Sequence, residues 1–152
     1  MTISRWKKIA LGGGSSIILL AVLVGYFEPS STPGIPYRDV TGVWTNCNGN
    51  THGVDPNITM TVSLCAEVDD NNEKQALTSL ANVVKVPLTN NQRAAFADFI
   101  YNVGEGKFNH STMLRLINEG KIPEACKELF RWVYAGGKKR SDESRVGHEC
   151  RY

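Results

Sequence analysis

The stretch Glu28–Thr51, EPSSTPGIPYRDVTGVWTNCNGNT, separates the one long apolar run of the chain from a region of helical patterns. Its many Gly, Pro, Ser and Asn residues exclude a single helix and favour turns and short strands. Val43 and Trp44 indicate a strand of a hairpin, with turns at Gly42 and at Asn48-Gly49. We therefore expect a small hairpin to lead into a helical domain.

The composition sets the size of that domain. The chain has 152 residues and a net charge of +2, and about 125 residues remain after the apolar run, which is enough for one domain. No stripe of Lys and Arg with interleaved aromatic residues is present, so we expect no nucleic-acid partner. A mildly basic chain would suit a polyanionic bacterial envelope, although it would suit many other surroundings equally well.

The region after the hairpin predicts four helices, each starting at a residue suited to the beginning of a helix. In the second of them, Phe96, Phe99 and Ile100 share one face and are expected in the core. Trp132 with Arg131 could line a cleft, or Trp132 could belong to the core. The predicted helices run over 62–82, from Thr89 to about Asn102, from Ser111 to Gly120, and from Pro123 to Gly136-Gly137.

Residues 1–27 predict a membrane segment. Arg5, Lys7 and Lys8 precede residues 9–27, which carry no charge. A helix of that length spans about 28 Å, just enough to cross a bilayer, with its basic end in the cytoplasm. Six glycines and serines weaken the span. A cleaved signal peptide is the alternative, but no small-x-small cleavage site follows the apolar core.

The four cysteines predict disulfides. None has the CxxC spacing of a zinc site and the histidines show no ligand spacing, so we expect neither metal nor cofactor. Four cysteines allow three pairings. In an exported chain we favour Cys47–Cys65 and Cys126–Cys150, because each pair closes a local loop. Four buried free thiols are the alternative.

Two carboxylates in the opening stretch suggest glycosidase chemistry. One protonated carboxyl donates to the leaving oxygen of a sugar bond, and the other activates water or attacks directly. Glu28 follows an apolar segment, where desolvation would raise its pKa as an acid requires. Asp39 would be kept ionised by Arg38 or by backbone donors, and Thr45 could hold the water. The alternatives are an interface charge at Glu28 and a turn residue at Asp39.

The segment PYRDVTGVWTNCNGNTHGVD (36–55) resembles the active-site hairpin of phage-type lysozymes, glycoside hydrolase family 24. That family follows a Glu by eight residues, then Asp or Cys, then five residues and a Thr. Five residues separate Asp39 from Thr45, as in the family. Three later blocks resemble its central and Arg-Trp helices, namely VKVPLTNNQRAAFADFIYNVGEGKF (84–108), STMLRLINEG (111–120) and ACKELFRWVYAGGK (125–138).

The sequence departs from the family pattern at three places. Ten residues lie between Glu28 and Asp39 instead of eight, so either the loop has gained two residues or the acid is missing. Asn50 stands where the family usually has His. The tail after Lys138 is shorter than the last helix of the family, with Cys150 among the few residues that resemble it.

The resemblance implies an α+β fold: a mostly helical lysozyme-like domain with a small active-site β-hairpin. It implies an endolysin that hydrolyses the β-1,4 bond between N-acetylmuramic acid and N-acetylglucosamine in host peptidoglycan, with Glu28 as acid, Asp39 directing the water and Thr45 positioning it. The alternatives are a lytic transglycosylase and a catalytically dead, membrane-anchored peptidoglycan-binding protein.

The apolar segment has a counterpart in the same resemblance. Some endolysins of lambdoid phages begin with a weakly hydrophobic signal-anchor-release segment, which later leaves the bilayer and joins the folded enzyme. We therefore expect a signal anchor at 1–27 and a catalytic domain at 28–152. The protein would be a monomer, held first in the host inner membrane with its catalytic domain in the periplasm and then released there.

Overall fold

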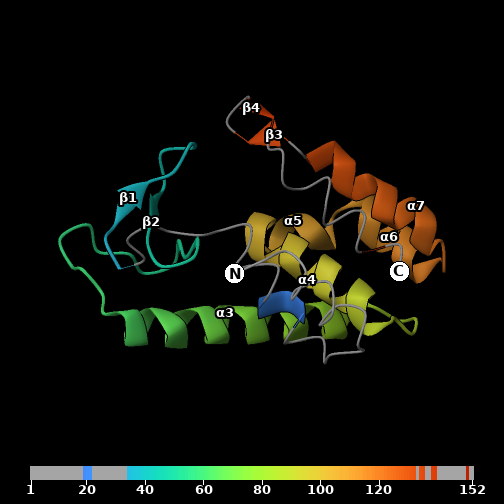
Figure 1. The fold of residues 1–152 in the computed structure, drawn as a ribbon. Helices are drawn as coiled ribbons and strands as arrows, with labels where there is room; N and C mark the ends of the chain where they lie inside the picture. The colour runs from blue at the N-terminus through green and yellow to red at the C-terminus, as the bar shows by residue number, and fades with distance from the viewer. Residues whose placement is uncertain (1–18, 22–33, 133, 136–137, 140–149, 151–152) are drawn as a thin grey trace, which may run out of the picture.

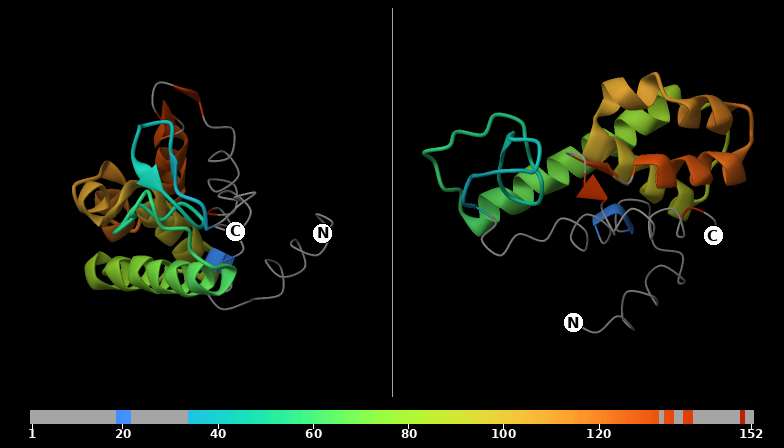
Figure 2. Two further views of the ribbon diagram at one scale, coloured as in Figure 1. Left: turned by 90° about the vertical axis from the view of Figure 1, so that its left-hand side faces the viewer. Right: turned by 90° about the horizontal axis from the view of Figure 1, so that it is seen from above.

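The chain folds into two lobes joined by one long helix. The computed structural model describes residues 19–21, 34–132, 134–135, 138–139 and 150. The hairpin lobe, residues 34–60, contains β1 (Tyr37–Arg38) and β2 (Trp44–Thr45), which pair antiparallel. It lies over the first half of α3 (Val62–Val83), and the helices that follow lie along the other half (Figure 1). The right-hand view of Figure 2 shows the same separation of the lobes.

Helix α3 begins where the sequence predicts. The Thr61 side chain accepts a hydrogen bond from Leu64 N at 3.2 Å and caps the helix. The buried face repeats every three or four residues and changes character along the helix. Its first half is polar and faces the hairpin lobe, whereas its second half is apolar and joins the core. The buried residues are Cys65, Asp69, Glu73, Ala76, Ser79 and Leu80.

The helical lobe, residues 90–132, is built around α4 (Asn90–Val103). Thr89 and Gln92 form the predicted capping box at its start, with both reciprocal hydrogen bonds present. Phe96, Phe99 and Ile100 are buried, as expected. Gly104 ends α4 at a φ of 89°, a conformation that favours glycine. The remaining helices are α5 (Glu105–Asn109), α6 (Thr112–Asn118) and α7 (Ile122–Glu128).

The end of the last predicted helix was wrong. Helix α7 stops at Glu128 and continues as the 3-10 turn η1 (Leu129–Trp132), followed by a second antiparallel pair, β3 (Tyr134–Ala135) and β4 (Lys138–Lys139). Residues 129–135 are rich in aromatic and branched side chains, which favour strands and packing over a regular helix. Trp132 packs edge-on against Phe99 at 5.1 Å between ring centroids, so it belongs to the core.

The core contains two residues of the predicted membrane segment. Residues 19–21 form a helical turn, and Leu19 and Leu20 are 5% and 0% exposed in the same cluster as Leu80 and Phe96. Most of the segment 1–27, and Glu28 with it, lies outside the described residues. Within the described part of the chain we find no helix with the length and apolar character needed to cross a membrane.

Both predicted disulfides are present. Cys47 is joined to Cys65, and Cys126 is joined to Cys150. The second bond ties the end of the chain to α7 in the helical lobe. Residues 140–149, where the last helix of the family was expected to be shortened, lie outside the described residues.

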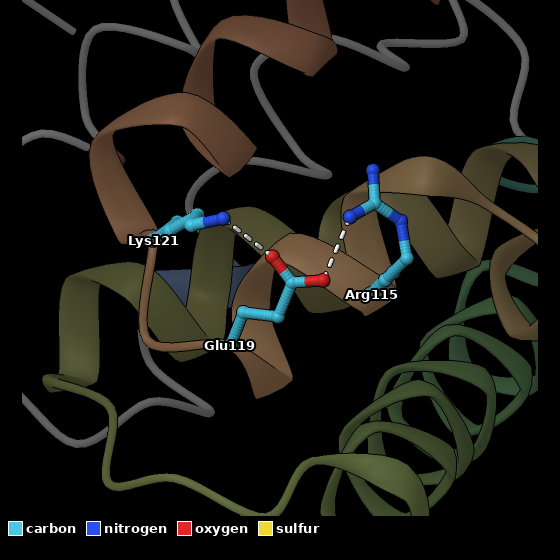
Figure 3. A network of polar contacts seen from close by, with 3 residues as sticks. All are labelled: Arg115, Glu119 and Lys121. Carbon is cyan, nitrogen blue, oxygen red and sulfur yellow. Dashed lines mark hydrogen bonds and ion pairs between the residues drawn. The ribbon is translucent and has the colours of Figure 1, made fainter.

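A surface network marks the turn between α6 and α7. Glu119 accepts hydrogen bonds from Lys121 at 2.8 Å and from Arg115 at 2.7 Å (Figure 3). These two bonds, that of Lys121 first, lower the pKa of Glu119. Exposed ion pairs of this kind contribute little to stability, so the network guides the turn more than it stabilises the fold.

Candidate active site

The hairpin carries two of the three predicted site residues, Asp39 in its turn and Thr45 on β2. Tyr37 pairs with Thr45 and Arg38 pairs with Trp44, so residues 39–43 form the connection. Asp39 donates its backbone N–H to Val43 O at 3.0 Å, and its own carbonyl accepts from Gly42 N at 3.0 Å. Gly42 has a φ of 83°, which this tight turn requires and which glycine adopts without a steric penalty.

The turn holds the Asp39 carboxylate in one position. Its Oδ1 accepts hydrogen bonds from Thr41 N at 2.8 Å, Thr41 Oγ1 at 2.7 Å and Val43 N at 2.9 Å. Desolvation raises the pKa of Asp39, but the hydrogen bonds from Thr41 and from the turn backbone outweigh it and lower the pKa overall. Asp39 is therefore an ionised carboxylate at neutral pH, as a base that directs water needs to be.

Thr45 is 2% exposed and its hydroxyl is oriented by the same turn. Its Oγ1 donates to Val43 O at 3.1 Å, the carbonyl that also accepts from Asp39 N. A hydroxyl has one hydrogen to donate. Because that hydrogen is directed at Val43, the Oγ1 lone pairs remain available as acceptors.

Arg38 does not hold Asp39 in its charged form. Its guanidinium donates to Gly42 O at 2.7 Å and lies 4.7 Å from the centroid of the Trp44 ring. This is a cross-strand cation–π contact. Of the two sources of stabilisation expected for Asp39, the structure therefore favours the backbone donors, assisted by Thr41.

Glu28, the predicted acid, lies outside the described residues. Asp39 and Thr45 both donate to the Val43 carbonyl, and the catalytic roles of all three residues stay predictions. The two ends of the hairpin lobe meet at Gly34 and Met60, where Gly34 is buried and its carbonyl accepts from Met60 N at 2.9 Å. A Cβ at Gly34 would lie 1.8 Å from Met60 O, so only glycine allows these two segments of the chain to approach this closely.

The loop after β2 is joined to α3. Cys47 adopts a φ of 50°, uncommon for a residue with a side chain, and forms its disulfide with Cys65 on α3. Asn48 donates from its backbone to Asp69 Oδ1 at 3.3 Å and from its side chain to Asp69 Oδ2 at 2.6 Å. Cys65 and Asp69 are one helical turn apart, so consecutive loop residues bind consecutive turns of α3.

Asn50 takes part in a polar network at the position where the family usually has His. Its side chain donates to Asn46 Oδ1 at 2.8 Å and to His52 O at 3.1 Å. Its Oδ1 accepts from Asn72 Nδ2 of α3 at 3.0 Å. The departure from the family pattern thus retains a polar contact between loop and helix, through an amide.

An open pocket of about 190 Å³ lies where the loop, α3 and the α4–α5 junction meet. Its lining is mostly polar, with amides, hydroxyls and one carboxylate, together with Tyr101. Four of the lining residues, 49–52, lie in the segment that resembles the active-site hairpin. The sequence patterns did not indicate that residues of α3 and of the α4–α5 junction join them, because these are far apart in the chain. The lining residues are Gly49, Asn50, Thr51, His52, Asn72, Gln75, Ala76, Ser79, Ile100, Tyr101, Gly104 and Glu105.

Two buried carboxylates on α3 were also missed by the sequence analysis. Asp69 and Glu73 are 7% and 6% exposed. Desolvation raises the pKa of Asp69, although its bonds from Asn48 oppose the change. Desolvation, and then the charges of Asp69 and Asp70, raise the pKa of Glu73 to about 7. Among the described residues no group of His, Cys, Asp and Glu is arranged to hold a metal ion.

Two lobes joined by a long helix, one of them with a carboxylate-bearing hairpin, define a lysozyme-like fold. The family model for phage lysozyme matches residues 31–143. The chain is 38% identical over 138 residues to the SAR-endolysins of Enterobacteria phages PA-2 and P21, covering 86% of this chain and 81% of theirs. The active form of the P1 phage endolysin Lyz superposes with a TM-score of 0.70 at 21% identity, covering 99% of this chain and 92% of that one.

The chain therefore belongs to the phage lysozyme family. It is a lysozyme, a glycosidase, which confirms the family assigned from the sequence blocks.

Proposed function

We propose that this lysozyme is an endolysin that hydrolyses the β-1,4 bond between N-acetylmuramic acid and N-acetylglucosamine in host peptidoglycan, and so lyses the host cell. The observation that supports this most is the fixed, ionised carboxylate of Asp39 on the same hairpin as the oriented hydroxyl of Thr45. Relatives named SAR-endolysins, 38% identical over most of the chain, support the biological role.

The proposed division of roles follows from the hydrogen bonds. Asp39 has its Oδ1 occupied by three donors, so its ionised carboxylate is held rigidly to orient a water. Thr45 would accept a hydrogen bond from the same water and fix it in place. Glu28 would act as the acid that protonates the leaving oxygen. The polar pocket beside Tyr101 offers amides and hydroxyls that suit the N-acetyl and hydroxyl groups of a glycan strand.

We further propose that residues 1–27 act as a signal anchor that later joins the folded enzyme of residues 28–152. Support comes from Leu19 and Leu20, which pack in the core with Leu80 and Phe96. Once the segment has left the bilayer, burying two leucines instead of exposing them to water contributes roughly 3–6 kcal/mol of hydrophobic free energy, which would hold the released segment in the folded enzyme. The enzyme would be a monomer, tethered first to the host inner membrane and active in the periplasm after release.

The reaction can be tested with purified peptidoglycan and mass analysis of the fragments. A hydrolase yields reducing N-acetylmuramic acid ends, whereas a lytic transglycosylase yields anhydro-sugar ends. Substitution Glu28→Gln should abolish cutting with either product. Retained cutting would assign the acid to another residue, and binding without any cutting by the unmodified enzyme would favour a catalytically dead peptidoglycan-binding protein.

The anchor can be tested by replacing Gly12, Gly13 and Gly14 with Leu. The longer apolar run should retain the protein in the membrane fraction and delay lysis, because leucine raises both helix propensity and apolar area. A matched replacement of the three glycines with Ser should still be released. Equal release of both variants would contradict the proposed anchor.

A further inference from the structure

Asn48 is bound from two helices at once. Its backbone and side-chain N–H groups donate to the Asp69 carboxylate of α3 at 3.3 and 2.6 Å. Its carbonyl oxygen accepts from the Tyr101 hydroxyl of α4 at 2.7 Å. One residue of the hairpin lobe therefore contacts both the connecting helix and the helical lobe, and residues 48 and 101 are far apart in the chain.

We propose that Asn48, Tyr101 and Asp69 form an inter-lobe clamp that positions the hairpin lobe for catalysis. This inference rests on the proposed function, because it concerns where Asp39 and Thr45 stand relative to a bound glycan. Tyr101 and Asp69 are positioning residues in this proposal. They act through the backbone of the loop and do not touch the reacting atoms.

The local backbone directs Asn48 toward its partners. Cys47 adopts the left-handed φ of 50°, a conformation that costs about 1 kcal/mol for a residue with a side chain. The Cys47–Cys65 disulfide holds this bend against α3. Asn48 follows this bend, and its N–H meets Asp69 while its carbonyl meets Tyr101. The strain is located where the chain changes direction toward the helices.

The clamp lies between the catalytic turn and the pocket. Thr45 is three residues before Asn48, and the pocket lining begins with Gly49 immediately after it. Tyr101 itself lines the pocket. A glycan held by the α3 and α4 residues of the pocket would therefore meet Asp39 and Thr45 at a separation that the clamp sets.

The Cys47–Cys65 disulfide and the two hydrogen bonds to Asp69 join the loop to α3, but not to α4. The Tyr101 hydroxyl adds the contact to α4, so its removal should loosen the loop relative to the pocket without unfolding either lobe. Substitution Tyr101→Phe removes only this hydroxyl and keeps the ring. Substitution Asp69→Asn keeps the size of the side chain but loses an acceptor for Asn48.

Two control variants remove the same kinds of chemical group at other positions of α3. Substitution Asp70→Asn removes one negative charge from the next residue of α3, which is exposed and paired with Lys74. Substitution Thr78→Val removes a hydroxyl that bonds to Lys74 O within the same helix. Among the described residues, the partner of each of these side chains lies on α3 itself, so neither control should change catalysis.

The kinetic test measures kcat and KM on soluble peptidoglycan fragments, at a temperature where melting curves show every variant to be folded. Tyr101→Phe and Asp69→Asn should each lower kcat about tenfold, since small displacements of a catalytic group have effects of that order or larger. KM should change less than kcat, and both controls should match the unmodified enzyme. A merely structural contact would lower the melting temperature and leave kcat unchanged.

Amide hydrogen exchange tests the clamp without any substrate. The backbone N–H of Asn46 donates to Asn50 O and that of Asn50 donates to Asn46 O, each at 2.9 Å. The exchange rates of these two amides therefore report on opening of the loop. In Tyr101→Phe these amides should exchange about tenfold faster, while the amides of α6 should not change. Unchanged exchange would overturn the clamp.

The outcomes separate this inference from the proposed function. Faster exchange with unchanged kcat would overturn the positioning role and leave the endolysin reaction intact. An unmodified enzyme that cuts no peptidoglycan would overturn the proposed function and the catalytic part of this inference together. The exchange measurement would then still decide whether the clamp exists. If Asp69→Asn does not fold, Tyr101→Phe alone decides each comparison.

Discussion

Asp39 and Thr45 share one acceptor, because the carbonyl of Val43 takes the backbone N–H of Asp39 at 3.0 Å and the hydroxyl of Thr45 at 3.1 Å. The N–H of the same Val43 donates to the Asp39 carboxylate at 2.9 Å. Val43 therefore bonds to both side chains that we propose to handle the water, and Thr41 supplies the other two hydrogen bonds to the Asp39 carboxylate.

Substitution Asp39→Asn should abolish activity without loss of the fold. Asparagine can still accept the hydrogen bonds of the turn through its oxygen, but it cannot activate water. We expect a fall in kcat of about a hundredfold or more, measured as release of reducing ends from peptidoglycan. Asp55→Asn is the matched control, because Asp55 holds a separate turn through Asn57 N at 2.8 Å. Activity that survives in Asp39→Asn would remove Asp39 from the mechanism.

Substitution Thr45→Val should lower kcat about tenfold or more, because the buried methyl group can neither bond to Val43 O nor accept from a water. The free energy of unfolding should fall by only about 1 kcal/mol for the lost hydrogen bond. Thr45→Ser keeps the hydroxyl and should retain most of the activity. If valine and serine variants are equally active, the hydroxyl has no role in the reaction.

Glu73 should make the protein less stable as the pH rises. Burial, with the nearby charges of Asp69 and Asp70, raises its pKa from 4.5 to about 7 in the folded state. The folded protein therefore binds a proton that the unfolded chain releases, and stability falls between about pH 4.5 and pH 7. Glu73→Gln should remove this loss and melt at a higher temperature than the unmodified protein at pH 8, but not at pH 4. The same difference in melting temperature between the two proteins at pH 4 and at pH 8 would contradict the raised pKa of Glu73.

Substitution Gly34→Ala should destabilise the hairpin lobe by about 2 kcal/mol or more, since the added Cβ would lie 1.8 Å from the backbone oxygen of Met60. Gly106→Ala, in helix α5, is the control, because its Cβ would meet nothing within 4 Å. Alanine there should leave stability unchanged or raise it by up to about 1 kcal/mol. Chemical denaturation of both variants measures the difference. Equal stabilities would contradict the close approach of Gly34 and Met60.

The helical lobe shows how far local patterns reach. Thr61, Thr89 and Ser111 cap the helices that the sequence predicts, since a capping side chain bonds to amides only two or three residues away. The prediction failed after Glu128, where the chain leaves the helix so that Trp132 can pack against Phe99. That contact joins residues distant in the sequence, so no local pattern contains it.

For the site, the sequence by itself determined the hairpin and the positions of Asp39 and Thr45 within it, because these depend on a short stretch of chain. It favoured the pairing of the cysteines that the structure shows, but it left other pairings open. The tertiary structure alone decided that Asn48 is bound by both Asp69 and Tyr101, and that Glu73 is buried beside another carboxylate. It also alone placed Leu19 and Leu20 in the core. These contacts join segments that meet only when the lobes pack, and burial and charge proximity are properties of that packing.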